Sequence, residues 1–374
     1  MVLIKLSILV AAFASLLYFT AKVRYTAENV VNISPSRPLT GKLSQTPKNT
    51  IQTIEKLFEG QLLGPECQVL HNGALYSSSI SGHLIKAVDG KIVKSLEIYK
   101  HNPECRELQC SHPLGMRYWK DEKFVFADGR LGIIVVDFEN ESFKQVYSAS
   151  TVIGDWSNMF ADDIEFIDNE TIIFSDMTPK YGFKDYQVGF FEMAKDGRLI
   201  KLNLNTGAYE LFVDNLLTPN GLIAHPDKQS LIVSSTAALQ LLRVYYAGPK
   251  KGSVEVFADG LPGIPDNLRA TSSGKTFWIS LYVAGTPLPQ RLGQYPKIRK
   301  WLSYYSQLLV PLTLSLAPNH QVFIEMDFDG DVVSSIHETE GRLKGTTNVI
   351  DDGKYLYFGS VHRNYIGRAL KPEA

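Results

Sequence analysis

Short hydrophobic runs alternate with turn residues from about residue 55 to the end of the chain. Examples are Phe124–Asp128, Thr171–Asp176, Leu231–Ser235 and Tyr355–Ser360, each rich in β-branched or aromatic residues with a turn close by. Runs of this length and composition, bounded by turns, are typical of β-strands. The pattern therefore predicts an all-β domain over residues 55–374.

Acidic and Asn-containing motifs recur along this pattern. They are Gly64-Pro65-Glu66, His112-Pro113-Leu114-Gly115, Ala161-Asp162-Asp163-Ile164, Pro219-Asn220-Gly221 and Pro265-Asp266-Asn267. From Glu66 the steps are 49 residues to Gly115, 47 to Asp162, 58 to Asn220 and 46 to Asp266. A propeller blade takes about 40–50 residues, and about 320 residues shared by six blades gives about 53 each. We therefore expect a six-bladed β-propeller whose motif loops meet at one end of the central channel.

The N-terminus has a different pattern. Leu6–Ala21 is apolar and uncharged, Lys5 precedes it, and Lys22 and Arg24 follow it. This length is borderline for a membrane-spanning helix, so residues 1–24 are expected to form a signal anchor, with a cleaved signal peptide as the alternative. The polar residues 25–54 are interpreted as a stalk. The rest of the chain is then lumenal or extracellular, at the endoplasmic reticulum or plasma membrane, or secreted.

A second segment, residues 286–315, also breaks the strand pattern. The apolar positions Trp301, Leu302, Tyr305 and Leu308 have helical spacing, and basic residues precede them. We expect a helical insert lying over one face of the propeller. Two interpretations stay open: a packed crossover helix, or a lid or membrane-surface contact.

Composition limits the function classes and the compartment. The chain is 44% hydrophobic and 21% charged, with a net charge of −1, which is ordinary for a globular protein and gives no footprint for nucleic acid. Cys105 and Cys110 are spaced to close a small disulfide in an oxidising compartment, whereas Cys67 is interpreted as a buried free thiol. N-glycosylation acceptor triplets begin at Asn32, Asn140 and Asn169.

Several strings resemble strictosidine synthase-like proteins. They are Gly64-Pro65-Glu66, Pro113-Leu114-Gly115, Ala127–Gly132, Asp163-Ile164, Pro219-Asn220-Gly221, Phe257–Asn267 and Tyr365–Arg368. The resemblance implies a six-bladed propeller related to paraoxonases, gluconolactonases and diisopropylfluorophosphatase-type enzymes. Those relatives hold calcium in the channel and hydrolyse esters, lactones or organophosphates, and membrane-bound animal members are linked to arylesterase activity. The plant enzyme that names the family instead condenses an amine with an aldehyde, without metal.

The resemblance implies a set of metal ligands in this sequence. Glu66, Asn220 and Asp266 match family positions that bind the ion, and Asn267 stands beside them. Asp162 stands where most members have Asn, which is a departure that adds a negative charge. Three carboxylates around one site repel each other unless a cation joins them, and calcium accepts variable sets of 6–8 oxygen ligands.

These residues suggest a calcium-dependent hydrolase of aryl esters or lactones. Asp266 or Asp162 is the candidate base or nucleophile, and His112 and His362 are candidates for proton transfer. A different class is also kept: a non-catalytic propeller that binds a partner or ligand through its upper face. Amine–aldehyde condensation is the weakest alternative, and the oligomeric state stays undecided.

Overall fold

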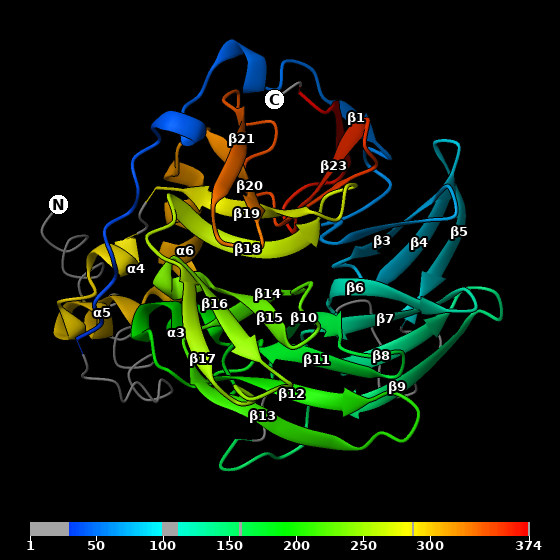
Figure 1. Ribbon diagram of the computed structural model, residues 1–374, viewed down its shortest axis with the longest axis horizontal. Coiled ribbons are helices and arrows are strands. Elements are labelled where there is room, and N and C mark those ends of the chain that lie inside the picture. The colour runs from blue at the N-terminus through cyan, green and yellow to red at the C-terminus, as the bar shows by residue number, and fades with distance from the viewer. Residues whose placement is uncertain (1–29, 99–110, 157–158, 286–287, 373–374) are drawn as a thin grey trace, which may run out of the picture.

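Six four-stranded antiparallel sheets surround a central axis in the computed structural model, which describes residues 30–98, 111–156, 159–285 and 288–372 (Figure 1). Short strands with frequent turns therefore close into a ring, as the sequence pattern indicated. The predicted six-bladed β-propeller is confirmed.

Each blade runs from an inner strand at the channel to an outer strand at the rim. From inner to outer, the first three blades are β2 (Gln68–His71), β3 (Ala74–Ser79), β4 (His83–Val88), β5 (Lys91–Glu97); β6 (Pro113–Lys120), β7 (Lys123–Asp128), β8 (Gly132–Asp137), β9 (Ser142–Ser148); and β10 (Ala161–Phe166), β11 (Thr171–Asp176), β12 (Gly197–Asn203), β13 (Tyr209–Leu216). The other three are β14 (Pro219–Ala224), β15 (Ser230–Ser235), β16 (Gln240–Tyr245), β17 (Val254–Ala258); β18 (Gly263–Ala270), β19 (Thr276–Ala284), β20 (Gln321–Asp327), β21 (Val332–Glu338); and β22 (Asn348–Asp351), β23 (Tyr355–Gly359), β24 (Ile366–Leu370), β1 (Glu55–Leu57).

The sixth blade joins the two ends of the described chain. Its outer strand is β1, which pairs with β24 through the register Glu55↔Arg368 and Leu57↔Ile366. An ion pair of 2.5 Å between Arg368 and Glu55 adds to this pairing. The ring is therefore closed by hydrogen bonds between the first and last strands.

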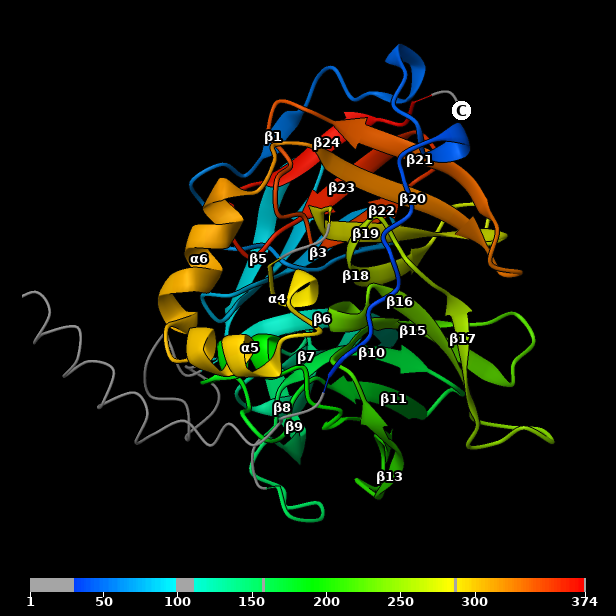
Figure 2. The same cartoon turned by 90° about the vertical axis from the view of Figure 1, so that its left-hand side faces the viewer.

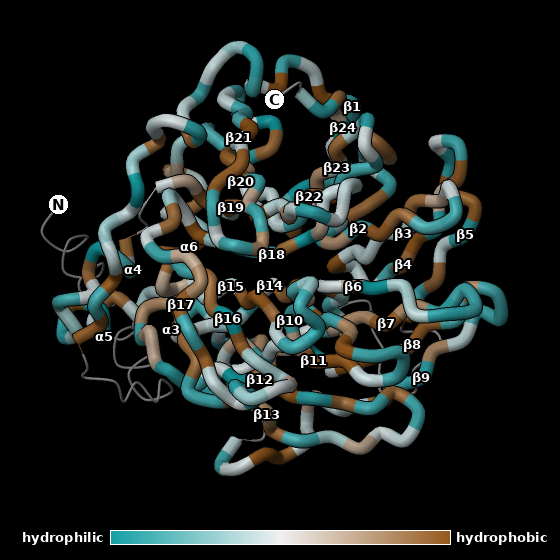
Figure 3. The backbone as a smooth tube through the Cα atoms, viewed as in Figure 1, coloured by the Kyte–Doolittle hydropathy of each residue, from teal (hydrophilic) through white to brown (hydrophobic). Residues whose placement is uncertain are grey.

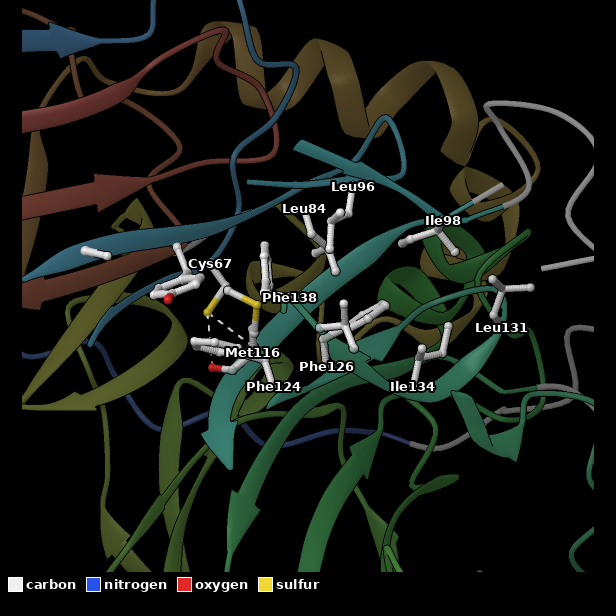
Figure 4. Packing of buried hydrophobic residues seen from close by; sticks show 13 residues of the cluster. Cys67, Leu84, Leu96, Ile98, Met116, Phe124, Phe126, Leu131, Ile134 and Phe138 are labelled. Atoms are coloured by element: carbon white, nitrogen blue, oxygen red, sulfur yellow. Dashed lines mark hydrogen bonds between the residues drawn. The ribbon is translucent and has the colours of Figure 1, made fainter. Parts of the chain in front are cut away.

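The hydrophobic core lies between neighbouring blades. Between the first two blades, Cys67, Met116, Phe124, Phe126 and Phe138 are buried in one cluster (Figure 4). Hydrophobic residues follow the strands, whereas the outer hairpin turns are largely hydrophilic (Figure 3). Burial of these strand faces holds each blade against the next.

Four α-helices interrupt the strand pattern of the described chain. They are α3 (Tyr186–Glu192), α4 (Leu288–Arg291), α5 (Pro296–Ser303) and α6 (Ser306–Leu316); short 3₁₀ turns are η1 (Gly41–Leu43), η2 (Pro47–Asn49) and η3 (Thr236–Ala238). Three of the helices occupy the segment 286–315, where the sequence predicted them, and α5 and α6 lie on the outside of one face (Figure 2). Over the residues that the structure describes, no helix is long and apolar enough to cross a membrane. The predicted anchor, residues 1–24, lies outside that part of the chain.

Strand register shows which end of the channel these helices cover. Ala161 at the start of β10 pairs with Asp176 at the end of β11, and Gly263 at the start of β18 pairs with Ala284 at the end of β19. The helix α3 follows β11, and α4 to α6 follow β19. All four helices therefore emerge at the end of the channel where the inner strands begin.

Candidate metal centre

A β-bulge recurs near the start of four inner strands. The register shifts between Pro113 and Met116, between Ala161 and Ile164, between Pro219 and Leu222, and between Pro265 and Leu268. A bulge changes the direction in which the local side chains point, and bulges are common beside functional sites. The second residues of these bulges are Leu114, Asp162, Asn220 and Asp266. Four sequence motifs therefore share one structural position.

Glu66 occupies the same position in the first blade. The N–H of Cys67 donates to Ser78 Oγ at 3.1 Å, as the N–H of Asp163 donates to Ser175 Oγ at 3.1 Å. The residue before each of these is Glu66 or Asp162. Four of the predicted ligands thus come to one end of the channel, and we call Glu66, Asp162, Asn220 and Asp266 the acidic set.

The carboxylates of the acidic set are buried near one another. Burial raises the pKa of Glu66 to about 7, with Asp163 adding to the rise and Arg269 opposing it. Burial likewise holds the pKa of Asp162 well above its usual range, and repulsion from Asp266 and Glu66 raises it further. The pKa of Asp266 is raised by burial and then by Glu66. The acidic set therefore resists carrying its full negative charge.

Two oxygen atoms of the acidic set have no hydrogen-bond partner. They are Glu66 Oε2 and Asn220 Oδ1, both buried. Among the described residues, no three His, Cys, Asp or Glu side chains are drawn together closely enough to hold a metal ion by themselves. A cation at the acidic set therefore requires the amide oxygen of Asn220 and a closer approach of the carboxylates. Unpartnered buried oxygens are the groups that gain most from such a cation.

Asn267, another predicted ligand, has a different set of contacts. Its Nδ2 donates to Glu66 Oε1 at 2.5 Å. Its Oδ1 accepts from Arg269 Nη2 at 3.4 Å. In this structure Asn267 therefore orients Glu66 and leaves the second oxygen of Glu66 unpartnered.

A buried ion network lies next to the acidic set, one residue further along the strands. Asp163 is fully buried and accepts from Arg269 Nη1 at 2.8 Å and from Arg117 Nη1 at 3.0 Å. Arg117 also donates to the carbonyl of Leu222 at 2.9 Å. Although burial opposes ionisation, the two guanidinium groups hold the pKa of Asp163 below its usual value. We call Arg117, Asp163 and Arg269 the paired set.

Neither arginine of the paired set was among the site residues predicted from the sequence. Each stands four residues after the Pro that opens its motif, at Pro113 and Pro265. That shared offset is the signal from which they could have been found. Asp163 itself belongs to the quoted motifs and was expected to support the site or cap the loop, but its pairing with two arginines was not predicted.

Cys67 borders the paired set. Its Sγ accepts from Arg269 Nη2 at 3.2 Å. It also accepts from the N–H of Met116 at 3.3 Å (Figure 4). Burial raises the pKa of this thiol, so it stays protonated. The expectation of a buried free cysteine is confirmed. The predicted Cys105–Cys110 disulfide lies outside the described residues.

Aromatic and apolar side chains cover the acidic set. One hydrophobic cluster combines Leu114, Phe160 and Met177 with Phe183, Tyr186, Phe190 and Val361. Met177 Sδ accepts from Asn220 Nδ2 at 3.8 Å. The pKa of Tyr186 is raised by burial and by Asp162, which places its hydroxyl near that carboxylate. Tyr186 and Phe190 belong to α3, so a helix that the sequence did not predict forms part of this cover.

The two candidate histidines lie around this cover. His112 packs its ring 4.3 Å from that of Phe183, and burial and Arg130 lower its pKa to about 3, so it is neutral at physiological pH. His362 hydrogen-bonds through Nε2 to the hydroxyl of Tyr282. The pKa of Tyr282 is raised by burial, Tyr186 and Asp266. His362 is therefore linked to the acidic set through a tyrosine, whereas the described contacts of His112 lead to Phe183 and Asp128.

Fold and site together define a six-bladed β-propeller with buried carboxylates at one end of its channel. A strictosidine synthase family model matches residues 162–249. The chain is similar to the adipocyte plasma membrane-associated protein of Danio rerio, with 27% identity over 352 residues that cover 89% of this chain and 83% of the relative. The resemblance to strictosidine synthase-like proteins is therefore confirmed.

Solved structures show the same fold. A regucalcin from Agrobacterium tumefaciens, described as a calcium-binding protein, is similar with a TM-score of 0.56 at 13% identity, covering 87% of this chain and 96% of that one. A gluconolactonase from Xanthomonas campestris is similar with a TM-score of 0.56 at 14% identity, covering 85% and 89%. At this identity the similarity shows the fold alone.

Proposed function

We propose that this chain is a calcium-dependent hydrolase of aryl esters or lactones. The observation that carries the proposal is the acidic set: three buried carboxylates and an Asn whose oxygens are partly unpartnered, beneath an aromatic cover. The regucalcin and gluconolactonase named above share this fold and support the choice of cofactor and reaction class.

The residues of the acidic set offer the type of donor that calcium binds, and their carboxylates would have to move closer together to hold the ion. Their donors are carboxylate and carboxamide oxygens, the ligands that this hard cation prefers. Burial raises the pKa values of Glu66, Asp162 and Asp266, and repulsion from neighbouring carboxylates raises them further, so a cation would relieve that repulsion. Glu66, Asp162, Asn220 and Asp266 would hold the ion. When bound, calcium would supply Lewis-acid polarisation of a carbonyl oxygen.

The residues of the chain divide the remaining tasks. Asp162 or Asp266 would accept a proton from the attacking water through a carboxylate oxygen that does not hold the ion. Phe160, Phe183 and Tyr186 would bind the aryl group or lactone ring and exclude water. Tyr282, which hydrogen-bonds to His362, would pass a proton between the site and the exposed imidazole.

The test measures hydrolysis of phenyl acetate and of a six-membered lactone by the full-length protein in detergent. Chelation of calcium and Glu66→Gln should each lower kcat/KM at least about 100-fold, the order expected when an electrostatic stabiliser is lost. The matched control is Glu210→Gln, which removes an exposed carboxylate on β13 and should leave kcat/KM unchanged. Full activity with both the chelator and Glu66→Gln would rule out the proposal.

A second function is favoured by one observation. The residues of the acidic set are only between 2% and 8% exposed, because the aromatic cover lies over them. A closed site of this kind suits a propeller that binds a partner through its surface and keeps calcium as a structural ion. Calcium that raises the melting temperature while no ester or lactone is hydrolysed would favour this reading.

The proposed location is a single-pass membrane protein with its propeller in the lumen or outside the cell. The relative from Danio rerio is named as membrane-associated. The predicted glycosylation acceptors Asn32, Asn140 and Asn169 are all exposed, so the fold leaves them accessible to modification. Deglycosylation of the full-length protein tests on which side of the membrane the propeller lies. A shift in gel mobility is expected, and it should be absent when all three Asn residues are replaced by Gln.

A further inference from the structure

Helices α5 and α6 and the residue before them expose a row of large apolar side chains. The row consists of Tyr295, Ile298, Trp301, Leu308, Leu312 and Leu316, which are between 46% and 75% exposed. Leu308, Leu312 and Leu316 are four residues apart and therefore share one side of α6. A contiguous exposed patch of this kind usually marks an interaction site. We call these six residues the α5–α6 face.

The charged residues of the segment that carries the α5–α6 face all have one sign. From residue 286 to residue 320 the sequence contains no Asp or Glu, but it has Arg291, Lys297, Arg299 and Lys300. Arg299 is buried, whereas Lys297 and Arg291 are exposed. Segments with exposed Trp and Leu side chains and flanking basic residues typically bind the surface of bilayers that contain anionic lipids.

The position of the N-terminal segment points to the same partner. The N–H of Val31 donates to the carbonyl of Gly293 at 3.0 Å, so the chain enters the described structure beside α5. The apolar segment predicted to enter the membrane ends at Ala21, ten residues earlier. Ten residues reach at most about 35 Å. A bilayer that holds this segment therefore lies within reach of the α5–α6 face.

We propose that the α5–α6 face docks on the lipid bilayer, with Trp301 and the three leucines of α6 in the interfacial layer and the basic residues at anionic headgroups. This contact is separate from the predicted anchor. Because α4 to α6 emerge at the end of the channel that carries the acidic set, docking turns that end of the propeller toward the membrane (Figure 2). An apolar ester or lactone dissolved in the bilayer would then reach the site without crossing bulk water.

The experiment uses the intrinsic fluorescence of the full-length chain reconstituted in vesicles. The four tryptophans are Trp119, Trp156, Trp278 and Trp301, so the predicted anchor has none. Brominated phosphatidylcholine quenches only tryptophans in contact with lipid, and the difference between the wild type and Trp301→Phe isolates Trp301. We expect Trp301 to be quenched, and more strongly when phosphatidylserine is present.

Paired variants connect the quenching to the face. Leu308→Ser with Leu312→Ser should reduce the quenching of Trp301 at least about threefold, because the apolar contact with lipid is lost. The matched control is Val93→Ser, which removes a 58% exposed apolar side chain on β5 and should leave the quenching unchanged. Equal melting temperatures establish that all variants are folded.

Two results would overturn the proposal. The first is a Trp301 that brominated lipid does not quench; if cross-linked dimers accompany it, the face belongs to a second copy of the chain. The second is quenching that persists unchanged in the double-serine variant.

Discussion

Asp162 and Asp163 are neighbours on one strand and are both buried, yet their electrostatic states are opposite. The pKa of Asp162 is raised by burial and by Asp266 and Glu66, whereas Arg117 and Arg269 lower that of Asp163. Alternation along the strand sends one carboxylate into the acidic set and the other into the paired set. The difference shows that the carboxylates of the acidic set repel one another, whereas the carboxylate of the paired set is balanced by two arginines.

The paired set and the acidic set contribute differently to the stability of the channel. A buried carboxylate held by two arginines fixes the geometry of the inner strands. A set of carboxylates without cations is costly alone and gains energy when a cation enters. The paired set therefore serves as the rigid base on which the acidic set is presented.

The largest expected effect is a contrast between adjacent substitutions. Asp163→Asn leaves Arg269 without its paired carboxylate and leaves Arg117 with Glu165 alone, so it should lower the free energy of unfolding by about 3–5 kcal/mol. Asp162→Asn removes a repelled charge and should leave the calcium-free protein within about 1 kcal/mol of the wild type. Urea denaturation in the presence of chelator measures both. Equal losses for the two variants would contradict the division between the sets.

The second prediction concerns pH in the absence of calcium. The pKa of Glu66 rises from 4.5 to about 7 on folding, so the folded state binds a proton that the unfolded state lacks. This stabilisation, about 3 kcal/mol, is complete below pH 4.5 and is lost as the pH rises through 7. Asp163 acts in the opposite sense: its contribution is present above 3.8 and is lost as the pH falls through its lowered pKa.

Urea midpoints between pH 5 and pH 8, with chelator, measure this slope. Glu66→Gln should make the urea midpoint depend less on pH, because the variant lacks the carboxylate that binds a proton on folding. Saturating calcium should reverse the fall in stability toward pH 8, because the ion binds the ionised carboxylates. A midpoint that rises with pH in the wild type without calcium would be inconsistent with the raised pKa.

The smallest expected effect is that of Arg117→Lys. The lysine keeps the positive charge but loses the forked contacts with Asp163 and the carbonyl of Leu222. Because Arg269 still pairs with Asp163, the free energy of unfolding should fall by only about 1–2 kcal/mol. The melting temperature measures it, with Lys201→Arg on the exposed side of β12 as the control. If the free energy of unfolding falls as far as in Asp163→Asn, Arg117 alone, and not Arg269, balances the charge of Asp163.

Much of the fold and part of the site could be predicted from the sequence. The motif spacing identified the inner strands, and the equivalence of Asp162, Asn220 and Asp266 follows from a bulge that each motif encodes. The paired set was missed because its members are 46 and 106 residues apart and meet only when the ring is formed. The helix α3 was missed because its aromatic residues also suit a strand.

Local strand patterns also could not reveal how the sixth blade is completed. Glu55 and Arg368 are 313 residues apart, so nothing near β1 in the sequence shows which strand it pairs with. The prediction that Asp266, Asp162, His112 and His362 act in catalysis stays a prediction, since a role in turnover is not visible in contacts.

Completion of the sixth blade has a consequence for biosynthesis. The strand β1 leaves the ribosome first, but its partner β24 leaves it last, and domains fold as the chain emerges. Until β24 has been synthesised, β1 and β23 both present open edges, which attract other unpaired strands. A nascent chain truncated before Ile366 keeps these edges. The closed ring therefore forms only after β24 has been synthesised, and a product without β24 should expose these edges to chaperones.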